Sequence, residues 1–174
     1  MKILAISGNG RDASTNTALL EAVSKIASPD NDVTVFSSVA DLPVFSPDAE
    51  KYPLPPTVQS FANMISEHQG LIFSSLEYVR AIPGGLKNAI DWLVSRDEFI
   101  SKPIALMHAS HRGEDMLKQL RLVLSTVSDG FAPEIFLSFD FIKLSPDEIS
   151  KVMMKPLNRQ KVTDFLQDFS KQCA

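Results

Sequence analysis

Short polar residues and one arginine gather in residues 7–16, which read Ser-Gly-Asn-Gly-Arg-Asp-Ala-Ser-Thr-Asn. The apolar run before them, residues 2–6, is typical of a buried strand, and the residues after them begin a helical pattern. A helix N-terminus carries backbone N–H groups without partners, so this junction is suited to hold an anion such as a phosphate. Gly8 and Gly10 let the backbone approach a ligand, and Arg11 supplies positive charge. An ordinary polar turn with a surface arginine is the alternative interpretation.

Two familiar phosphate-binding loops do not fit this stretch. The P-loop pattern Gly-x-x-x-x-Gly-Lys-Ser/Thr is missing from it, which disfavours a P-loop nucleotidase. The dinucleotide pattern Gly-x-Gly-x-x-Gly would require a glycine where Ala13 stands. A mononucleotide is therefore a better candidate ligand than a dinucleotide.

Apolar runs alternate with amphipathic helical patterns along the rest of the chain. We expect strands at residues 2–6, 33–36, 71–75, 103–107 and 133–137, and helices at 15–27, 55–66, 83–92, 114–127 and 156–169, with an irregular segment before the last helix. This alternation predicts an α/β fold: a flavodoxin-like three-layer sandwich with a five-stranded parallel sheet of order 2-1-3-4-5, formed by residues 1–174 as a single domain. In that order the loops after strands one and three flank the point where the winding reverses.

Composition narrows the classes of partner. The chain has 174 residues, a formal net charge of -4 and scattered lysines and arginines, so we expect no nucleic-acid partner. It holds no apolar run of about 18 residues and no signal-peptide pattern at its start, so we expect neither membrane insertion nor secretion. Its only cysteine, Cys173, cannot form an internal disulfide, which favours the cytoplasm.

Two motifs resemble a known family. Residues 8–16 resemble the Gly-Ser-x-Arg-x-x-Ser-x-Asn loop of the NADPH-dependent FMN reductases, a family that includes quinone, azo-dye and chromate reductases. Residues 77–92, with Glu-Tyr followed by Pro-Gly-Gly-Leu-Lys-Asn-Ala-Ile-Asp-Trp, resemble that family's Pro-Glu-Tyr-Asn-x-x-x-Pro-Gly-x-Leu-Lys-Asn-Ala-Asp/Ile-Asp-Trp segment. Both motifs lie where the predicted winding reverses, and the strand pattern extends the resemblance over nearly the whole chain.

The resemblance implies a bound FMN and specific residues for it. The FMN phosphate would be held by Gly8, Asn9, Arg11, Ser14 and Asn16. The isoalloxazine ring would be bordered by the backbone of Glu77, Tyr78, Val79 and Arg80, with Ser110 near its polar edge. The resemblance also implies NAD(P)H as electron donor and a second acceptor such as a quinone, free flavin, azo compound or metal oxyanion. Because the cofactor carries that chemistry, we nominate no catalytic side chain.

Several residues depart from the family pattern. Asn9 replaces the usual Ser, Leu76 replaces Pro and Val79 replaces Asn, while residues 111–114 are less glycine-rich than the family's third loop. Arg80 stands where a small or aromatic residue is common. Its guanidinium could contact the phosphates of NADPH, fold over the flavin, or remain a solvated surface charge.

The helix expected from Pro83 suggests an oligomer. Ile90, Trp92 and Leu93 offer more apolar surface than one helix stripe needs, so we expect a homodimer or homotetramer that uses this helix. Lys87, Asn88 and Asp91 would be polar groups of that interface. His68 and His108 stand apart from any Cys/His cluster, so we expect no metal site.

Other functions remain open on the sequence alone. A flavodoxin-like electron carrier would bind the same flavin without nicotinamide turnover, and a scaffold could have lost FMN through the changes at Leu76, Val79 and Arg80. A Ser-His-Asp hydrolase is disfavoured because Gly-x-Ser-x-Gly is missing from the sequence.

Overall fold

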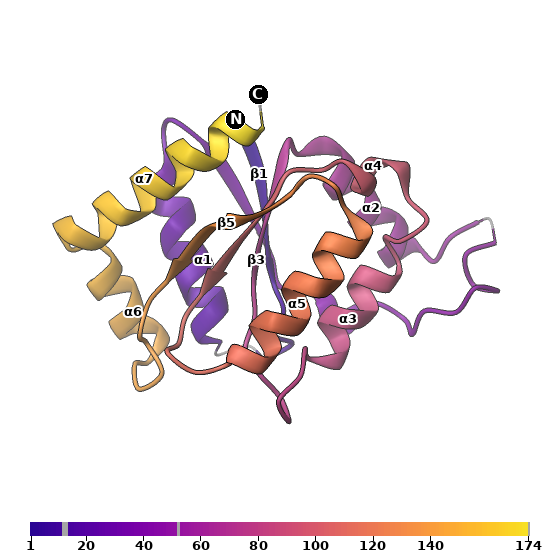
Figure 1. Ribbon diagram of the computed structural model, residues 1–174, viewed down its shortest axis with the longest axis horizontal. Coiled ribbons are helices and arrows are strands. Elements are labelled where there is room, and N and C mark those ends of the chain that lie inside the picture. The colour runs from indigo at the N-terminus through magenta and orange to yellow at the C-terminus, as the bar shows by residue number, and fades with distance from the viewer. Residues whose placement is uncertain (12–13, 52, 174) are drawn as a thin grey trace.

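The computed structural model describes residues 1–11, 14–51 and 53–173, and its strands form one parallel sheet of order β2-β1-β3-β4-β5 (Figure 1). The strands are β1 (Lys2–Ser7), β2 (Asp32–Phe36), β3 (Gly70–Ser74), β4 (Ile104–His108) and β5 (Phe131–Ser138). Ile3 of β1 pairs with Val33 on one side and with Gly70 on the other, so the winding reverses between β1 and β3. The predicted flavodoxin-like order is confirmed.

Helices cover both faces of the sheet (Figure 1). One face carries α1 (Thr15–Ala27), α6 (Pro146–Met153) and α7 (Pro156–Gln172). The other carries α2 (Pro56–Glu67), α3 (Gly84–Asp91), the short α4 (Asp97–Ile100) and α5 (Glu114–Val127), with the 3-10 turn η1 (Val39–Asp41) beside α3. None of the described helices combines the length and the apolar character needed to span a lipid bilayer.

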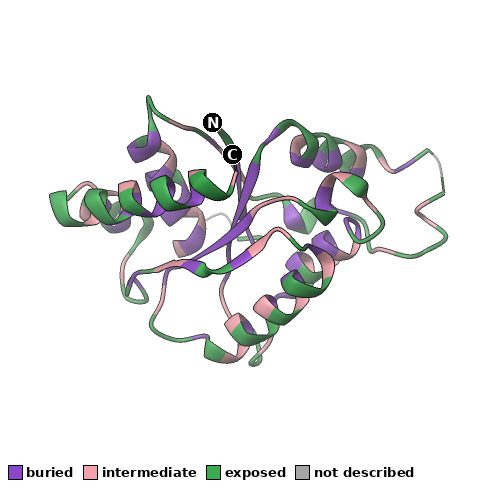
Figure 2. Ribbon diagram, turned by 45° about the horizontal axis from the view of Figure 1, so that its top comes forward, coloured by how far each residue is buried: buried purple, intermediate pink, exposed green. Residues whose placement is uncertain are grey.

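Side-chain alternation along the strands explains the two layers. In β1, Ile3 and Ala5 join the core under α1, whereas Leu4 and Ile6 join the core under α2 and α3. Successive side chains of a strand point to opposite faces, so an uninterrupted apolar strand fits a sheet that is covered on both sides. Figure 2 shows the central strands buried and the outer faces of the helices exposed.

The prediction for the segment between β5 and the last helix is wrong. Residues expected to be irregular contain α6, which begins after Ser145. The Ser145 side chain accepts a hydrogen bond from the Glu148 N–H, and the Glu148 carboxylate accepts one from the Ser145 N–H, which is a capping box. The Ser-x-x-Glu spacing was therefore a readable signal for a helix start. The short helix α4 was also not predicted.

The apolar residues of the helix expected from Pro83 are not available to a partner subunit. Ile90, Trp92 and Leu93 are fully buried inside the protein, and the Trp92 indole N–H donates to the Pro43 carbonyl at 2.7 Å. The prediction that these three side chains form a subunit interface is therefore wrong.

The polar residues of the same helix are also engaged within the chain. The Asn88 amide oxygen accepts a hydrogen bond from the Phe45 N–H at 2.7 Å, so this side chain anchors the proline-rich loop. Lys87 pairs with Asp91 at 2.5 Å along the helix. Neither contact needs a second subunit.

Candidate functional site

Three loops meet at the carboxyl edge of the sheet, because β1, β3 and β4 are neighbours in it. Their described residues are 8–11 and 14 after β1, 75–83 after β3 and 109–113 after β4. In the described part of the chain, all buried polar side chains except His68 and Ser128 lie at this edge: Ser7, Asn9, Ser14, Asn16, Ser74, Ser75 and His108. Buried polar groups need partners, so their concentration here indicates a site built for a polar ligand.

The first loop ends at the N-terminus of α1, where the described residues of the first helical turn include no acidic side chain. The Ser14 side chain caps α1 by accepting from the Thr17 N–H at 3.2 Å, and the Ser14 carbonyl accepts from the Ala18 N–H. The N–H groups of Thr15 and Asn16 form no hydrogen bond with the residues that the structure describes. No acidic residue stands in the first turn of α1. Backbone donors without a partner among the described residues, together with the helix dipole, fit an anion.

Close packing explains two glycines of the first loop. A Cβ at Gly8 would lie 2.5 Å from Ser75 Oγ and 2.6 Å from a Leu86 methyl carbon, and a Cβ at Gly10 would lie 2.6 Å from the Ala40 Cβ. The Gly8 N–H also donates to the Ser74 carbonyl at 2.8 Å. The loop is thereby held against the start of the second loop.

Three predicted side chains of the first loop make contacts within the protein. The Asn9 amide oxygen accepts from the Arg11 N–H at 3.2 Å, which stabilises the turn, and Ser14 caps α1 as described. The buried Asn16 amide oxygen accepts from the Ser74 hydroxyl at 2.8 Å and ties α1 to β3. Asp12 and Ala13, which belong to the same motif, lie outside the described residues.

Arg11 is exposed and borders a different hollow from the other loops. That neighbouring hollow of about 300 Å³ lies between the first loop and η1, and its other lining residues are Gly10, Thr17, Glu21, Ser37, Ser38, Ala40 and Asp41. The structure therefore places Arg11 on the β2 side of the first loop, beside a different hollow from Glu77 and Ser110.

The second loop contains a tight hairpin turn. Tyr78 and Ala81 exchange two backbone hydrogen bonds, of 3.1 and 2.9 Å, and the residues between them have positive φ angles, 49° at Val79 and 59° at Arg80. Two consecutive positive φ angles are typical of a type I′ turn, which favours Asn and Gly. A β-branched residue is disfavoured there, and Val79 is 99% exposed, so packing does not compensate for its strained backbone.

Three contacts tie this turn to the start of α5. The Glu77 carboxylate accepts from the Met116 N–H at 3.1 Å, and the Gln119 amide donates to the Arg80 carbonyl at 2.7 Å. Arg80 Nε donates to Asp115 Oδ2 at 2.5 Å, which raises the pKa of the guanidinium. The sequence alone did not identify a partner for Arg80, and the structure shows that it is Asp115. The exposed side chains of Tyr78, Val79 and Arg80 stand at the tip of the turn.

The third loop wraps around a buried histidine. His108 Nδ1 lies 2.9 Å from the Ser75 carbonyl oxygen and Nε2 lies 2.5 Å from the Arg112 carbonyl oxygen. The Ser110 hydroxyl accepts from the Arg112 N–H at 2.9 Å, so this predicted residue shapes the loop. His111, the next residue along, pairs with Asp140 at 2.7 Å, a hydrogen bond that lowers the pKa of that carboxyl.

A hollow of about 260 Å³ opens between the three loops. It is lined by Thr15, Asn16, Leu76, Glu77, His108, Ala109, Ser110, Arg112, Gly113 and Ile142. The structure thus brings together Asn16, Glu77 and Ser110 of the predicted residues. Sequence reasoning missed His108, Arg112 and Ile142; for His108, the position at the carboxyl end of a central strand was a usable signal.

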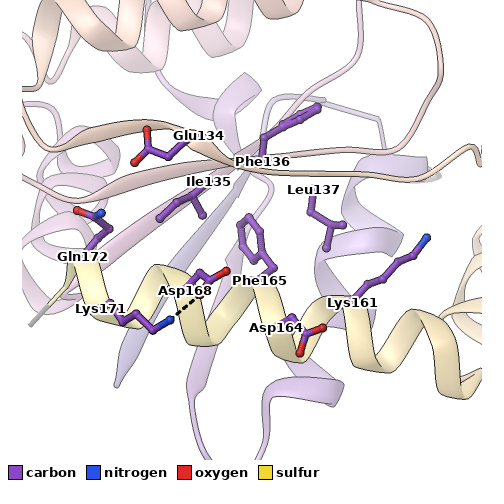
Figure 3. A pocket seen from close by; sticks show the side chains of 10 residues that line it. All are labelled: Glu134, Ile135, Phe136, Leu137, Lys161, Asp164, Phe165, Asp168, Lys171 and Gln172. Carbon is purple, nitrogen blue, oxygen red and sulfur yellow. Dashed lines mark hydrogen bonds and ion pairs between the residues drawn. The ribbon is translucent and has the colours of Figure 1, made fainter.

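A larger hollow lies elsewhere, between β5 and α7 (Figure 3). Its volume is about 500 Å³, and its only buried lining residues, Ile135 and Phe165, are apolar. Exposed charged side chains surround them, including the pair Lys171–Asp168. It has neither a free helix N-terminus nor a buried polar group, so the carboxyl edge is the better candidate site despite its smaller volume. Among the described residues, no group of three metal-binding side chains was found.

The family model for NADPH-dependent FMN reductases matches residues 1–142. The chain belongs to this family. A quinone reductase of Escherichia coli strain K12 is 31% identical over 113 residues, which are 63% of this chain and 60% of that protein, less than two thirds of its length. An NADH-dependent flavin reductase subunit 2 of Lactobacillus johnsonii is 32% identical over 155 residues, which are 88% of this FMN reductase family member and 75% of that protein.

A solved structure agrees with the fold of this FMN reductase family member. It is that of FerB, a flavoenzyme NAD(P)H:(acceptor) oxidoreductase from Paracoccus denitrificans, with a TM-score of 0.77, 20% sequence identity and 98% coverage of both chains. At this identity the likeness concerns the fold alone.

Proposed function

We propose that the protein binds FMN at the carboxyl edge of the sheet and is an NAD(P)H-dependent oxidoreductase that passes electrons to a small-molecule acceptor. The observation that carries this proposal is the start of α1: the N–H groups of Thr15 and Asn16 have no partner among the described residues, the first turn has no acidic side chain, and a cluster of buried polar side chains lies beside it. A doubly charged phosphate is stabilised by such donors and by the helix dipole. Family membership supports the same cofactor.

The first loop fits the phosphate end of FMN. Gly8 and Asn9 would offer backbone N–H groups, and the N–H groups of Thr15 and Asn16 lack partners among the described residues. Ser14 has a hydroxyl proton to donate, because its oxygen accepts from Thr17. Arg11 would add a charge-assisted contact from the other side of the loop.

The second and third loops fit the ring end. Glu77, Tyr78, Val79 and Arg80 would border the isoalloxazine with their backbone, since Glu77 and Arg80 use their side chains to hold α5. Ser110 would lie near the polar edge, in a loop fixed by its bond to Arg112. When bound, FMN accepts a hydride from a reduced nicotinamide and passes electrons on to an acceptor. The role of the protein's residues would be to bind and orient the cofactor.

The acceptor class follows the relatives' names. A quinone is the first candidate, because one relative is a quinone reductase, and a free flavin is the second, because another is a flavin reductase subunit. We infer a homodimer or homotetramer as the working form. Exposed Tyr78 and Val79 at the tip of the second loop support this inference, since exposed apolar side chains beside a site favour an interface.

We also infer a cytoplasmic location. Burial raises the pKa of the only cysteine, Cys173, to about 11, so this group stays a thiol at neutral pH and lacks a partner for an internal disulfide. That chemistry suits a reducing compartment.

A spectrum and a turnover assay test the proposed function. The purified protein mixed with FMN and passed through a desalting column is expected to keep a flavin absorption band and to oxidise NADH or NADPH when a quinone is added. A protein that retains no flavin would overturn the proposal. A protein that retains flavin without oxidising either nucleotide would instead be an electron carrier.

A further inference from the structure

His108 is a buried histidine whose two ring nitrogens both face carbonyl oxygens. Nδ1 lies 2.9 Å from the oxygen of Ser75, in the second loop, and Nε2 lies 2.5 Å from the oxygen of Arg112, in the third loop. The side chain is 2% exposed and lines the hollow between the loops. It is therefore part of the wall of the candidate site, yet the family resemblance assigns it no role.

The number of protons on the ring follows from these two contacts. A carbonyl oxygen only accepts hydrogen bonds, and a neutral imidazole has a single N–H to donate. With one proton, one nitrogen lone pair would face a carbonyl lone pair at hydrogen-bond distance without any water between them. Both contacts are hydrogen bonds only when both nitrogens carry protons, which makes the ring a cation.

We propose that His108 is a positioning residue held as an imidazolium, which fastens the second loop to the third and places a fixed positive charge in the wall of the flavin site. Acidic residues stand on the second loop and on α5. Glu77 lines the same hollow, and Glu114 and Asp115 stand in the first turn of α5. Arg112, also in the wall, and the N-terminal dipole of α5 oppose it.

The third loop packs closely against the ring. A Cβ at Gly113 would lie 3.1 Å from His108 Nε2, and Gly113 adopts a φ of 101°, which side chains rarely allow. The glycine thus lets the third loop close onto the imidazole. The His108 carbonyl also accepts from the Phe139 N–H at 2.9 Å, so the backbone of this residue is fixed as well.

The other histidines differ in the number and kind of their partners. His68 Nδ1 contacts a single carbonyl oxygen, that of Met64, at 2.6 Å, and a neutral ring satisfies this contact. His111 is exposed and faces the carboxylate of Asp140. Among these three histidines, only His108 bridges two carbonyl oxygens. His68 and His111 can therefore serve as controls for its protonation.

The charge has a consequence that rests on the proposed binding of FMN. Uptake of two electrons and one proton adds one negative charge to the flavin ring. A fixed cation in the wall of the site stabilises that charge and leaves the neutral oxidised ring nearly unaffected. His108 is therefore expected to make the protein bind reduced FMN more tightly than oxidised FMN.

Nitrogen-15 NMR of the histidine rings in the flavin-free protein at pH 7 tests the protonation directly. We expect His108, identified by the loss of its signals in His108→Gln, to show two protonated nitrogens, while His68 shows one. A His108 pattern with one protonated and one bare nitrogen would overturn the proposal. This readout does not depend on flavin binding, so it is separate from the test of the proposed function.

Redox titration with FMN tests the consequence. The midpoint potentials of free and bound FMN give the ratio of the affinities for reduced and oxidised flavin. This ratio is expected to fall roughly tenfold in His108→Gln, because one charge-assisted interaction is lost. His111→Gln, which alters a histidine of the same loop, is expected to leave the ratio unchanged. Equal ratios in wild type and His108→Gln would overturn the electrostatic role. If His108→Gln fails to fold, the His108 signals are assigned as those that remain in both His68→Gln and His111→Gln, and the wild-type NMR spectrum then decides.

Discussion

Helices α1 and α5 begin at the same edge of the sheet, but their N-termini differ in the acidic groups that surround them. At α5, Glu77 accepts from the Met116 N–H, and Glu114 and Asp115 stand in the first turn. At α1, a single neutral hydroxyl, that of Ser14, caps one N–H, and no acidic residue stands in the first turn. Both ends carry partial positive charge from the helix dipole. The α5 end is neutralised from within the chain, whereas no described residue neutralises the α1 end, which agrees with the proposed binding of a negatively charged ligand there.

Placing a carboxylate in the first turn of α1, as α5 already has, is expected to have the largest effect on FMN affinity. Asn16→Asp keeps the oxygen that accepts from Ser74 and adds a carboxylate in the first turn of α1. We expect a loss of FMN affinity of about 3 kcal/mol, roughly a hundredfold, from repulsion of the phosphate, with helix stability kept or increased. Fluorescence titration with FMN measures the loss. Asn63→Asp on the exposed face of α2 is the matched control, and equal affinities in the two variants would contradict the assignment.

Removing the cation of the first loop comes next. Arg11→Ala is expected to weaken FMN binding by about 1.5–3 kcal/mol, the size of a hydrogen bond to a charged group, with little change in stability. Lys25→Ala removes the same charge from the last turn of α1, far from the loop, and is expected to leave the affinity unchanged. The same titration compares the two. Wild-type affinity in Arg11→Ala would mean that the guanidinium, which borders the hollow beside η1, does not reach the phosphate.

Removing the Glu77 carboxylate tests the N-terminus of α5. Glu77→Ala deletes the acceptor of the Met116 N–H and is expected to lower the free energy of unfolding by about 1 kcal/mol, as for other helix caps. Urea denaturation measures this loss. Glu67→Ala at the exposed end of α2 serves as control, and an equally small loss in both variants would show that the Glu77 carboxylate is not a cap.

The smallest effect on stability is expected at the turn that contains Val79. Val79 has a φ of 49°, a conformation that Asn adopts more readily. Val79→Asn is therefore expected to raise the free energy of unfolding by up to about 1 kcal/mol, since no packing is lost at this exposed side chain. In Val44→Asn, another exposed valine with no positive φ, thermal melting should be unchanged. A lower melting temperature for Val79→Asn would argue that the valine is held by a contact outside this chain.

The sheet order and most elements could be predicted because the apolar periodicity is strong. Helix α1 and helix α5 have the predicted bounds, and the strand order follows from the alternation of strands and helices. Helix α6 was missed although Ser145 and Glu148 have capping-box spacing. Its apolar stripe is short, so periodicity alone gave a weak signal.

Side-chain partners could not be predicted, because they depend on contacts between distant residues. Burial of Trp92 follows from the loop that returns over it at Pro43, which periodicity does not reveal. The pairing of Arg80 with Asp115 and the position of His108 between two carbonyl oxygens likewise require the loops to be placed in space. The first loop was identified correctly as polar and glycine-rich, yet only the structure separates Arg11 from the hollow that Asn16 and Glu77 share.

The central claim is that the start of α1 is reserved for a phosphate, and a comparison of FMN with riboflavin tests it most directly. The two ligands share the isoalloxazine ring and differ by the phosphate alone. Fluorescence titration of the wild-type protein is expected to give an affinity for FMN at least roughly a hundredfold higher than for riboflavin, as free N–H donors and a helix dipole acting on a dianion require. Equal affinities for the two ligands would contradict the account.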